Sequence, residues 1–122
     1  MRWFVLNVIS GVVLMFLGAD SHAGDVEIVG AEARETGGTW RFAVTLKHAD
    51  TGWEHYADLW KVVAPDGTLL GQRILAHPHV NEQPFTRSLS GVVIPSEVDH
   101  VFIRARDSKH GMADETYRLD LK

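Results

Sequence analysis

The 122-residue sequence contains no cysteine and only four prolines. Without a thiol, the chain has no disulfide, no thiolate nucleophile, no iron–sulfur cluster and no cysteine-based zinc site. Basic residues are also few, because 12 Lys and Arg stand against 16 Asp and Glu and give a formal net charge of -4. Nucleic-acid binding needs a basic surface that neutralises phosphates, so this balance argues against DNA and RNA as partners.

Long hydrophobic runs are absent except at the N-terminus. A short positive start is followed by an almost wholly apolar stretch over residues 3–17 and by small or polar residues that end at Ala23. This order is typical of a secretory signal peptide, and the stretch is shorter than the ~20 apolar residues of a membrane-spanning helix. No cysteine follows it for lipid attachment. We therefore expect residues 1–23 to be a cleaved signal peptide and residues 24–122 to be a periplasmic or secreted domain with no membrane association.

The remaining sequence alternates apolar and polar residues with a period of two, which is typical of half-buried strands. Turn residues, such as Pro65-Asp66-Gly67, separate seven such runs. The candidate strands cover residues 25–34, 39–47, 56–64, 68–76, 84–93, 98–106 and 115–122. Seven short strands in about 100 residues predict an all-β, immunoglobulin-like or fibronectin-III-like sandwich, with a small barrel as the alternative. The expected core includes Trp40, Phe42, Trp60, Ile74, Leu89 and Ile103.

Six of the seven histidines lie beyond residue 23, and five of these fall in or beside three predicted loops. In the predicted sandwich, these three loops emerge at the same end, so the five imidazoles would converge. Neutral imidazole is the commonest protein ligand for transition metals and needs no accompanying thiolate. The sequence therefore predicts a metal site built from His48, His55, His77, His79 and His110.

Other residues in these loops extend the candidate site. Five acidic residues are candidate ligands or hydrogen-bond acceptors that would fix the imidazole tautomers: Asp50, Glu54, Asp58, Glu82 and Asp107. Met112 offers a thioether that favours Cu(I). The pattern favours one transition metal ion, copper or zinc with iron as a further candidate, in a carrier, chaperone or sensor. The sequence leaves open whether His48 is a ligand or a buried hydrogen-bonding residue.

Two other functions fit the same sequence. One is a metal-free adhesion or assembly module, in which the histidines are ordinary turn residues and Trp53 and Tyr56 bind a periplasmic protein partner. The other is a metal-dependent redox enzyme with an open coordination position. The sequence has no G-x-S-x-G, H-E-x-x-H, EF-hand or phosphate-loop motif. We therefore expect a binding protein rather than an enzyme.

Two short segments match a known arrangement of residues. In the first, His48 is followed by Glu54-His55-Tyr56 and then by Trp60. In the second, Asp107 and His110-Gly111 are spaced as in a Cys-x-x-His-Gly motif, with Asp107 in the place of the cysteine. Both segments resemble the superoxide reductases, the neelaredoxin and desulfoferrodoxin group.

This resemblance implies an immunoglobulin-like sandwich and a mononuclear iron site of four histidines and one cysteine. The implied ligands here are His48, His55 and His110, with His77 or His79 as the fourth histidine. The chain departs from the family because Asp107 cannot supply the thiolate and because the spacing from Tyr to Trp is one residue longer. The resemblance therefore supports a metal site at these loops and does not support superoxide reduction.

Overall fold

The computed structural model describes residues 25–122, so the predicted signal peptide lies outside the described residues. The described chain forms eight strands: β1 (Glu27–Thr36), β2 (Thr39–Lys47), β3 (Ala57–Val63), β4 (Leu69–Ile74), β5 (Phe85–Val92), β6 (His100–Asp107), β7 (Gly111–Met112) and β8 (Tyr117–Asp120). Within this part of the chain, no helix is long and apolar enough to cross a membrane. The all-β prediction is confirmed.

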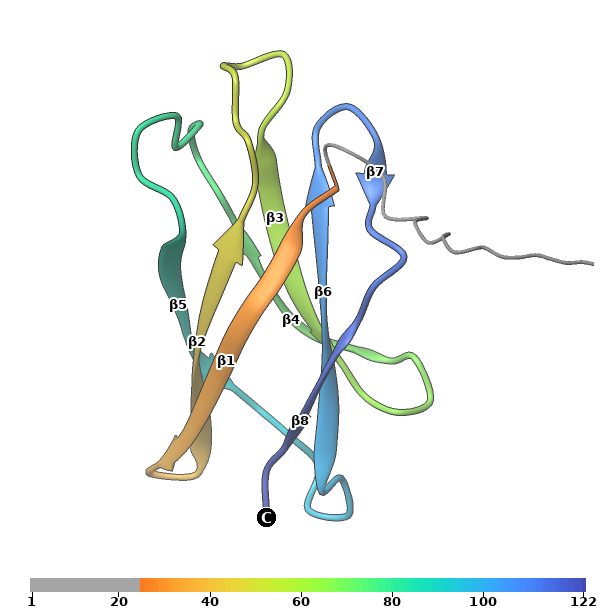
Figure 1. Ribbon diagram of the computed structural model, residues 1–122. Helices are drawn as coiled ribbons and strands as arrows, with labels where there is room; N and C mark the ends of the chain where they lie inside the picture. Colours follow the sequence, from red (N-terminus) through yellow and green to blue (C-terminus); the bar gives the residue numbers. More distant parts are fainter. Residues whose placement is uncertain (1–24) are drawn as a thin grey trace, which may run out of the picture.

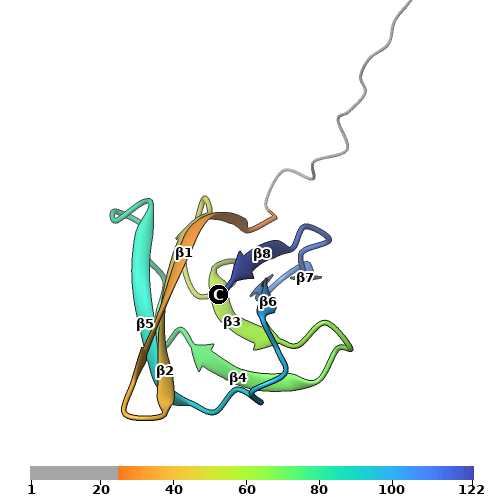
Figure 2. The same cartoon turned by 90° about the horizontal axis from the view of Figure 1, so that it is seen from below.

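The strands form two antiparallel sheets that pack against each other as a sandwich (Figure 1). One sheet has the order β1-β2-β5, and the other has the order β4-β3-β6-β7, with β8 also pairing with β6. Figure 2, seen from below, shows the first sheet as one layer and the second curving opposite it. The sandwich prediction is confirmed, and the likeness to immunoglobulin or fibronectin-III domains stays a prediction.

The structure has eight strands where the sequence predicted seven. The seven predicted runs correspond to β1–β6 and β8, and the added strand is the two-residue β7. Gly111 has a φ of 81°, a left-handed conformation that glycine adopts without steric cost. The chain therefore turns back directly after β6, and Met112 pairs with Arg106.

The core lies between the two sheets and follows the predicted alternation. Its fully buried members include Phe42, Val44 and Leu46 of β2, Trp60 and Val62 of β3, and Val101, Ile103 and Ala105 of β6. Leu89 is only partly buried. The prediction for Ile74 is wrong, because its side chain is 57% exposed. Successive side chains of an extended chain point to opposite sides, and here Leu75 takes the inward position.

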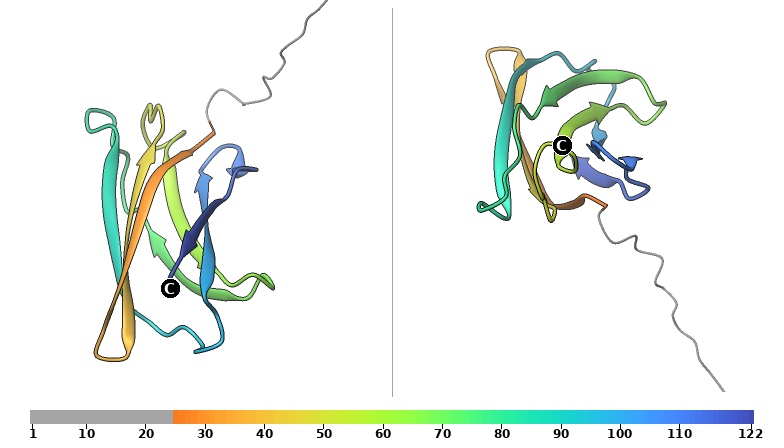
Figure 3. Two further views of the ribbon diagram at one scale, coloured as in Figure 1. Left: turned by 60° about the horizontal axis from the view of Figure 1, so that its bottom comes forward. Right: turned by 90° about the horizontal axis from the view of Figure 1, so that it is seen from above.

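Three loops meet at one end of the sandwich, as the views in Figures 1 and 3 show. They are residues 48–56 between β2 and β3, residues 75–84 between β4 and β5, and residues 108–110 between β6 and β7. The backbone N–H of Ser108 donates to the carbonyl of Tyr56 over 2.8 Å and links two of them. We call this end, made by the three loops, the loop pole.

The buried Phe42 provides a test of the core. Because its side chain has no exposed surface, Phe42→Ala removes apolar contacts and leaves a cavity, and we expect a loss of about 3–5 kcal/mol in the free energy of unfolding. Val93 is 68% exposed, so Val93→Ala is a matched control with an expected change within about 0.5 kcal/mol. Urea unfolding followed by tryptophan fluorescence measures both. Equal losses in the two variants would contradict this description of the core.

Candidate metal centre

His48 directly follows β2 and points into the interior. Its side chain points to the same side of the chain as that of Leu46, two residues earlier, and is fully buried. The Nδ1 atom of His48 lies 2.5 Å from the Oδ1 atom of Asp50. A carboxylate that accepts a proton from one imidazole nitrogen fixes the tautomer and orients the other nitrogen, as is typical of metal-binding histidines. The Nε2 atom of His48 is thereby presented to Asp107.

Asp50 also connects two loops of the pole. Its Oδ1 atom accepts a hydrogen bond from the backbone N–H of Ala57 at 3.1 Å, and its Oδ2 atom accepts one from the backbone N–H of His79 at 2.7 Å. The Gln83 side chain accepts from the backbone N–H of His48 and donates to the carbonyl of His79. His48 is therefore held on both its backbone and its ring.

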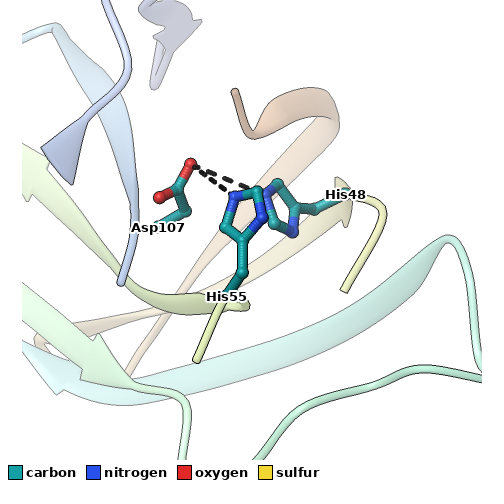
Figure 4. Close-up of side chains that lie close together, drawn as sticks. All are labelled: His48, His55 and Asp107. Atoms are coloured by element: carbon teal, nitrogen blue, oxygen red, sulfur yellow. Dashed lines mark ion pairs between the residues drawn. The ribbon is translucent and has the colours of Figure 1, made fainter. Parts of the chain in front are cut away.

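Asp107 is the last residue of β6, and its side chain is almost fully buried. Its Oδ1 atom accepts hydrogen bonds from the backbone N–H groups of Lys109 and His110. Its Oδ2 atom faces three imidazole nitrogens: Nε2 of His48 at 3.5 Å, Nε2 of His55 at 3.6 Å and Nδ1 of His110 at 3.1 Å. Figure 4 shows the first two of these contacts. Three imidazoles therefore surround one buried carboxylate oxygen.

The environment of Asp107 favours its charged form. Burial is the largest influence and by itself would raise the pKa of the carboxyl, but the backbone N–H groups of His110 and Lys109 and the His110 ring together lower this pKa below its usual value. Asp107 is therefore a carboxylate that is held inside the protein, next to three potential ligands.

Two of the three imidazole contacts of Asp107 suit shared coordination of a metal ion better than direct hydrogen bonds, whereas His110 lies at hydrogen-bond distance. The contacts from His48 and His55 are longer than the ~2.7–3.2 Å of an ordinary N–H···O hydrogen bond. Two ligands of a tetrahedral ion with bonds of ~2.0–2.1 Å stand about 3.4 Å apart. The Nε2 atom of His55 is also buried and has no hydrogen-bond partner among the described residues. His48, His55 and Asp107 could therefore hold a metal ion.

The cluster is buried on one side and open on the other. The side chains of His48 and Asp107 are inaccessible, whereas those of His55 and His110 are 16% and 41% exposed. The His55 ring packs edge to face against both other imidazoles, with centroids 4.8 Å apart in each pair. The exposed side of the cluster is therefore formed mainly by His110, since the Nε2 atom of His55 is itself buried.

His77 and His79 do not join this cluster. The His79 ring stacks on Phe85 with centroids 4.0 Å apart, and its Nε2 atom accepts a hydrogen bond from Arg87 at 2.9 Å. Burial, followed by the charge of Arg87, lowers the pKa of His79. The His77 ring lies 4.7 Å from that of His79, and its Nδ1 atom is 3.1 Å from the carbonyl of Pro78. The five imidazoles that were expected to converge therefore form a cluster of three, around Asp107, and a separate pair, His77 and His79. The pair is separate because the His79 ring stacks on Phe85 and accepts a hydrogen bond from Arg87.

The remaining candidate residues lie around the cluster. Glu54 is exposed, and its carboxylate lies close to Gly52. Among the described residues, it belongs to neither group that could hold a metal ion. Met112 is half-buried in β7. Trp53 is 67% exposed and packs edge to face on Tyr56, with centroids 5.6 Å apart.

One candidate ligand was missed by sequence reasoning. Asp25 offers a carboxylate oxygen that lies within 4.8 Å of ligand atoms of both Asp107 and His110. No spacing pattern marks Asp25, because it lies more than 80 residues from its neighbours and is brought to them only by the packing of β1 beside the second sheet. An aspartate just before a strand is otherwise an ordinary solvent-facing residue.

The fold and the site together define a small two-sheet β protein with a histidine and aspartate cluster at its loop pole that could hold a metal ion. No family model matches the sequence, and no solved structure matches it. The sequence is 35% identical over 97 residues to a protein of Halomicrobium mukohataei that is named "Putative lipoprotein". The match covers 79% of this chain and 47% of the relative, so the chain spans about half the length of that protein.

The acceptor role of Asp50 can be tested through stability. Asp50→Ala leaves the buried N–H groups of Ala57 and His79 without an acceptor, at roughly 1–3 kcal/mol each, so we expect the free energy of unfolding to fall by about 3–4 kcal/mol. Asp66→Ala is the control, because Asp66 is exposed and accepts from a single turn N–H, and it should change stability little. Denaturant unfolding measures both. A similar midpoint for the two variants would contradict the role of Asp50.

Proposed function

We propose that the loop pole binds one transition metal ion, copper or zinc, through His48, His55, His110 and Asp107, and that the protein is a metal carrier, chaperone or sensor. The observation that carries this proposal is the convergence of three imidazole nitrogens on one buried carboxylate oxygen. Nitrogen and oxygen donors without a thiolate suit zinc and Cu(II), and iron fits the same donors less selectively.

His48, His55 and His110 are also ligands that the resemblance to superoxide reductases implies. In the described part of the chain, the fourth histidine that the resemblance implies is absent from the cluster. Asp107 stands in the place of the family's cysteine and faces the same three imidazoles. A carboxylate is a harder ligand than a thiolate and does not donate electron density in the same way. This difference supports metal binding and transfer rather than superoxide reduction as the role of this chain.

The exposure of the ligands supports a carrier, chaperone or sensor more than a structural metal site. Structural zinc sites are usually enclosed by four protein ligands; this site also has four, but the side chain of one of them, His110, is 41% exposed and can be displaced by another ligand. An exposed side allows the ion to exchange with solvent or with a partner. The buried carboxylate and His48 provide the fixed part of the site.

Two observations support action outside the cytoplasm. The N-terminal residues have the pattern of a secretory signal peptide. The relative from Halomicrobium mukohataei has a name that describes a lipoprotein, a class of exported protein. We therefore propose that this chain is periplasmic or secreted.

Trp53 and Tyr56 favour a second candidate function, the binding of a protein partner. A 67% exposed tryptophan that packs against a tyrosine is the kind of aromatic pair that dominates many protein interfaces. The pair flanks His55 in the sequence, so a partner bound there would sit beside the metal cluster. This surface serves either metal transfer to that partner or, in a metal-free adhesion module, binding alone.

The metal proposal predicts one tightly bound ion per chain. The full chain is expressed without a histidine tag and exported, and the metal is measured by elemental mass spectrometry and by Zn²⁺ and Cu²⁺ titration. His55→Ala with His110→Ala should lower the affinity at least about 100-fold, because it removes two ligands. His77→Ala is the matched control and should bind like the wild type, since His77 lies outside the cluster. A wild-type chain that takes up neither ion would overturn the proposal.

The partner candidate has its own test. Chelation should abolish a metal-dependent partner interaction and leave a metal-free one intact. Trp53→Ala should weaken the interaction in either case, at unchanged metal affinity, because Trp53 is exposed and outside the cluster. A purified partner that binds Trp53→Ala as well as the wild type would exclude this surface.

A further inference from the structure

Asp25 is held beside the cluster by the start of β1. Val26, the next residue, is 2% exposed and belongs to the hydrophobic core, so it anchors the backbone on which Asp25 stands. Figure 1 shows this end of the described chain next to the turn between β6 and β7. A carboxylate oxygen of Asp25 lies within 4.8 Å of ligand atoms of Asp107 and His110.

Two potential groups of ligands share Asp107. The first consists of His48, His55 and Asp107, and the second consists of Asp25, Asp107 and His110. The ligand atoms within each group lie no more than 4.8 Å from one another. The His55 and His110 rings, which belong to different groups, are in contact with centroids 4.8 Å apart. The two groups therefore share Asp107 and adjoin at the contact between the His55 and His110 rings, so a single ion bound by both would draw their ligand atoms closer together.

The second carboxylate has no cationic partner in the cluster. Within the described residues, the ion pairs near Asp107 involve only histidines, and none joins Asp25 to a lysine or arginine. Two carboxylates that approach each other at the edge of a buried site repel, because the local dielectric constant is low. A cation between them removes this repulsion.

We propose that Asp25 is a fifth ligand of the metal site and that it makes the site selective for a divalent ion over Cu(I). This inference rests on the metal site proposed above. Two carboxylates and three neutral imidazoles balance the charge of a divalent ion and leave a net charge of -1 around Cu(I). Carboxylates are also harder ligands than Cu(I) prefers. Zn²⁺ and Cu²⁺ therefore match both the charge and the donor atoms.

The same ligand connects the metal to the start of the first strand. Asp25 belongs to the chain segment before β1, whereas Asp107 and His110 belong to the end of β6 and the turn after it. An ion bound to all three crosslinks the two sheets at the loop pole. Metal binding should therefore slow amide hydrogen exchange at the start of β1, because ends of strands open more readily than their centres.

The experiment compares Asp25→Asn with Glu27→Gln in the full chain. Both variants remove one negative charge near the start of β1, but Glu27 is exposed and outside the potential metal-binding groups. Competition with a chromogenic chelator should show a Zn²⁺ affinity about 10–100-fold lower for Asp25→Asn and nearly unchanged for Glu27→Gln. Affinity for Cu(I), measured with a Cu(I) chelator, should change less than that for Zn²⁺ in Asp25→Asn. The unfolding midpoint without metal checks that both variants fold.

The outcomes separate this inference from the proposed function. Equal Zn²⁺ affinity of the wild type and Asp25→Asn would overturn the role of Asp25 and leave the metal site standing. Two Zn²⁺ ions per wild-type chain would also overturn it, because the two groups would then be separate sites. A wild type that binds no metal would overturn both proposals. Zn²⁺-dependent protection at residues 26–28 in the wild type, lost in Asp25→Asn, would support the inference independently of affinity.

Discussion

The buried charge of Asp107 is the constraint on which the loop pole depends. A carboxylate inside a β-sandwich is costly unless hydrogen bonds or a cation compensate for the lost hydration. The turn after β6 supplies part of this compensation, because the backbone N–H groups of Lys109 and His110 point at its Oδ1 atom. The Oδ2 atom is left to the three imidazoles. The turn that leads into the short β7 therefore also encloses that charge.

A second buried carboxylate gives the cluster its rigid side. Asp50 orients the His48 ring and accepts backbone N–H groups from two loops, so loops that lack regular structure are fixed by side-chain acceptors. Buried polar networks of this kind specify one arrangement when every member is satisfied. The network here leaves the Nε2 atom of His55 without a hydrogen bond. In the proposed metal site, that atom would bind the ion and complete the network.

Much of the fold followed from periodicity, and the details of the site did not. Alternation places Phe42 and Ile103 in the core, and the same parity carried past the end of β2 puts His48 inside the protein. The prediction that Ile74 is buried was wrong, because Ile74 lies on β4, a strand at the edge of its sheet, where the burial of one face is less strictly required. The position of His110 and His79 in loops could not show that only His110 lies beside Asp107. The position of the His79 ring depends on its contacts with Phe85 and Arg87. Asp25 carried no signal, because only the packing of β1 beside the second sheet brings it to Asp107 and His110.

The side chains of the proposed metal site differ in exposure, and this difference would set the order in which an ion is bound and released. The side chains of His110 and His55 are 41% and 16% exposed, so in the proposed metal site an arriving ion would meet them first. The His48 side chain is fully buried, and its ring and its backbone are both held by hydrogen bonds. A partner that offers its own ligands would therefore compete first for the positions of His110 and His55, while His48 and Asp107 retain the ion. Stepwise exchange of this kind avoids releasing a free ion, which is the property that a metal carrier needs.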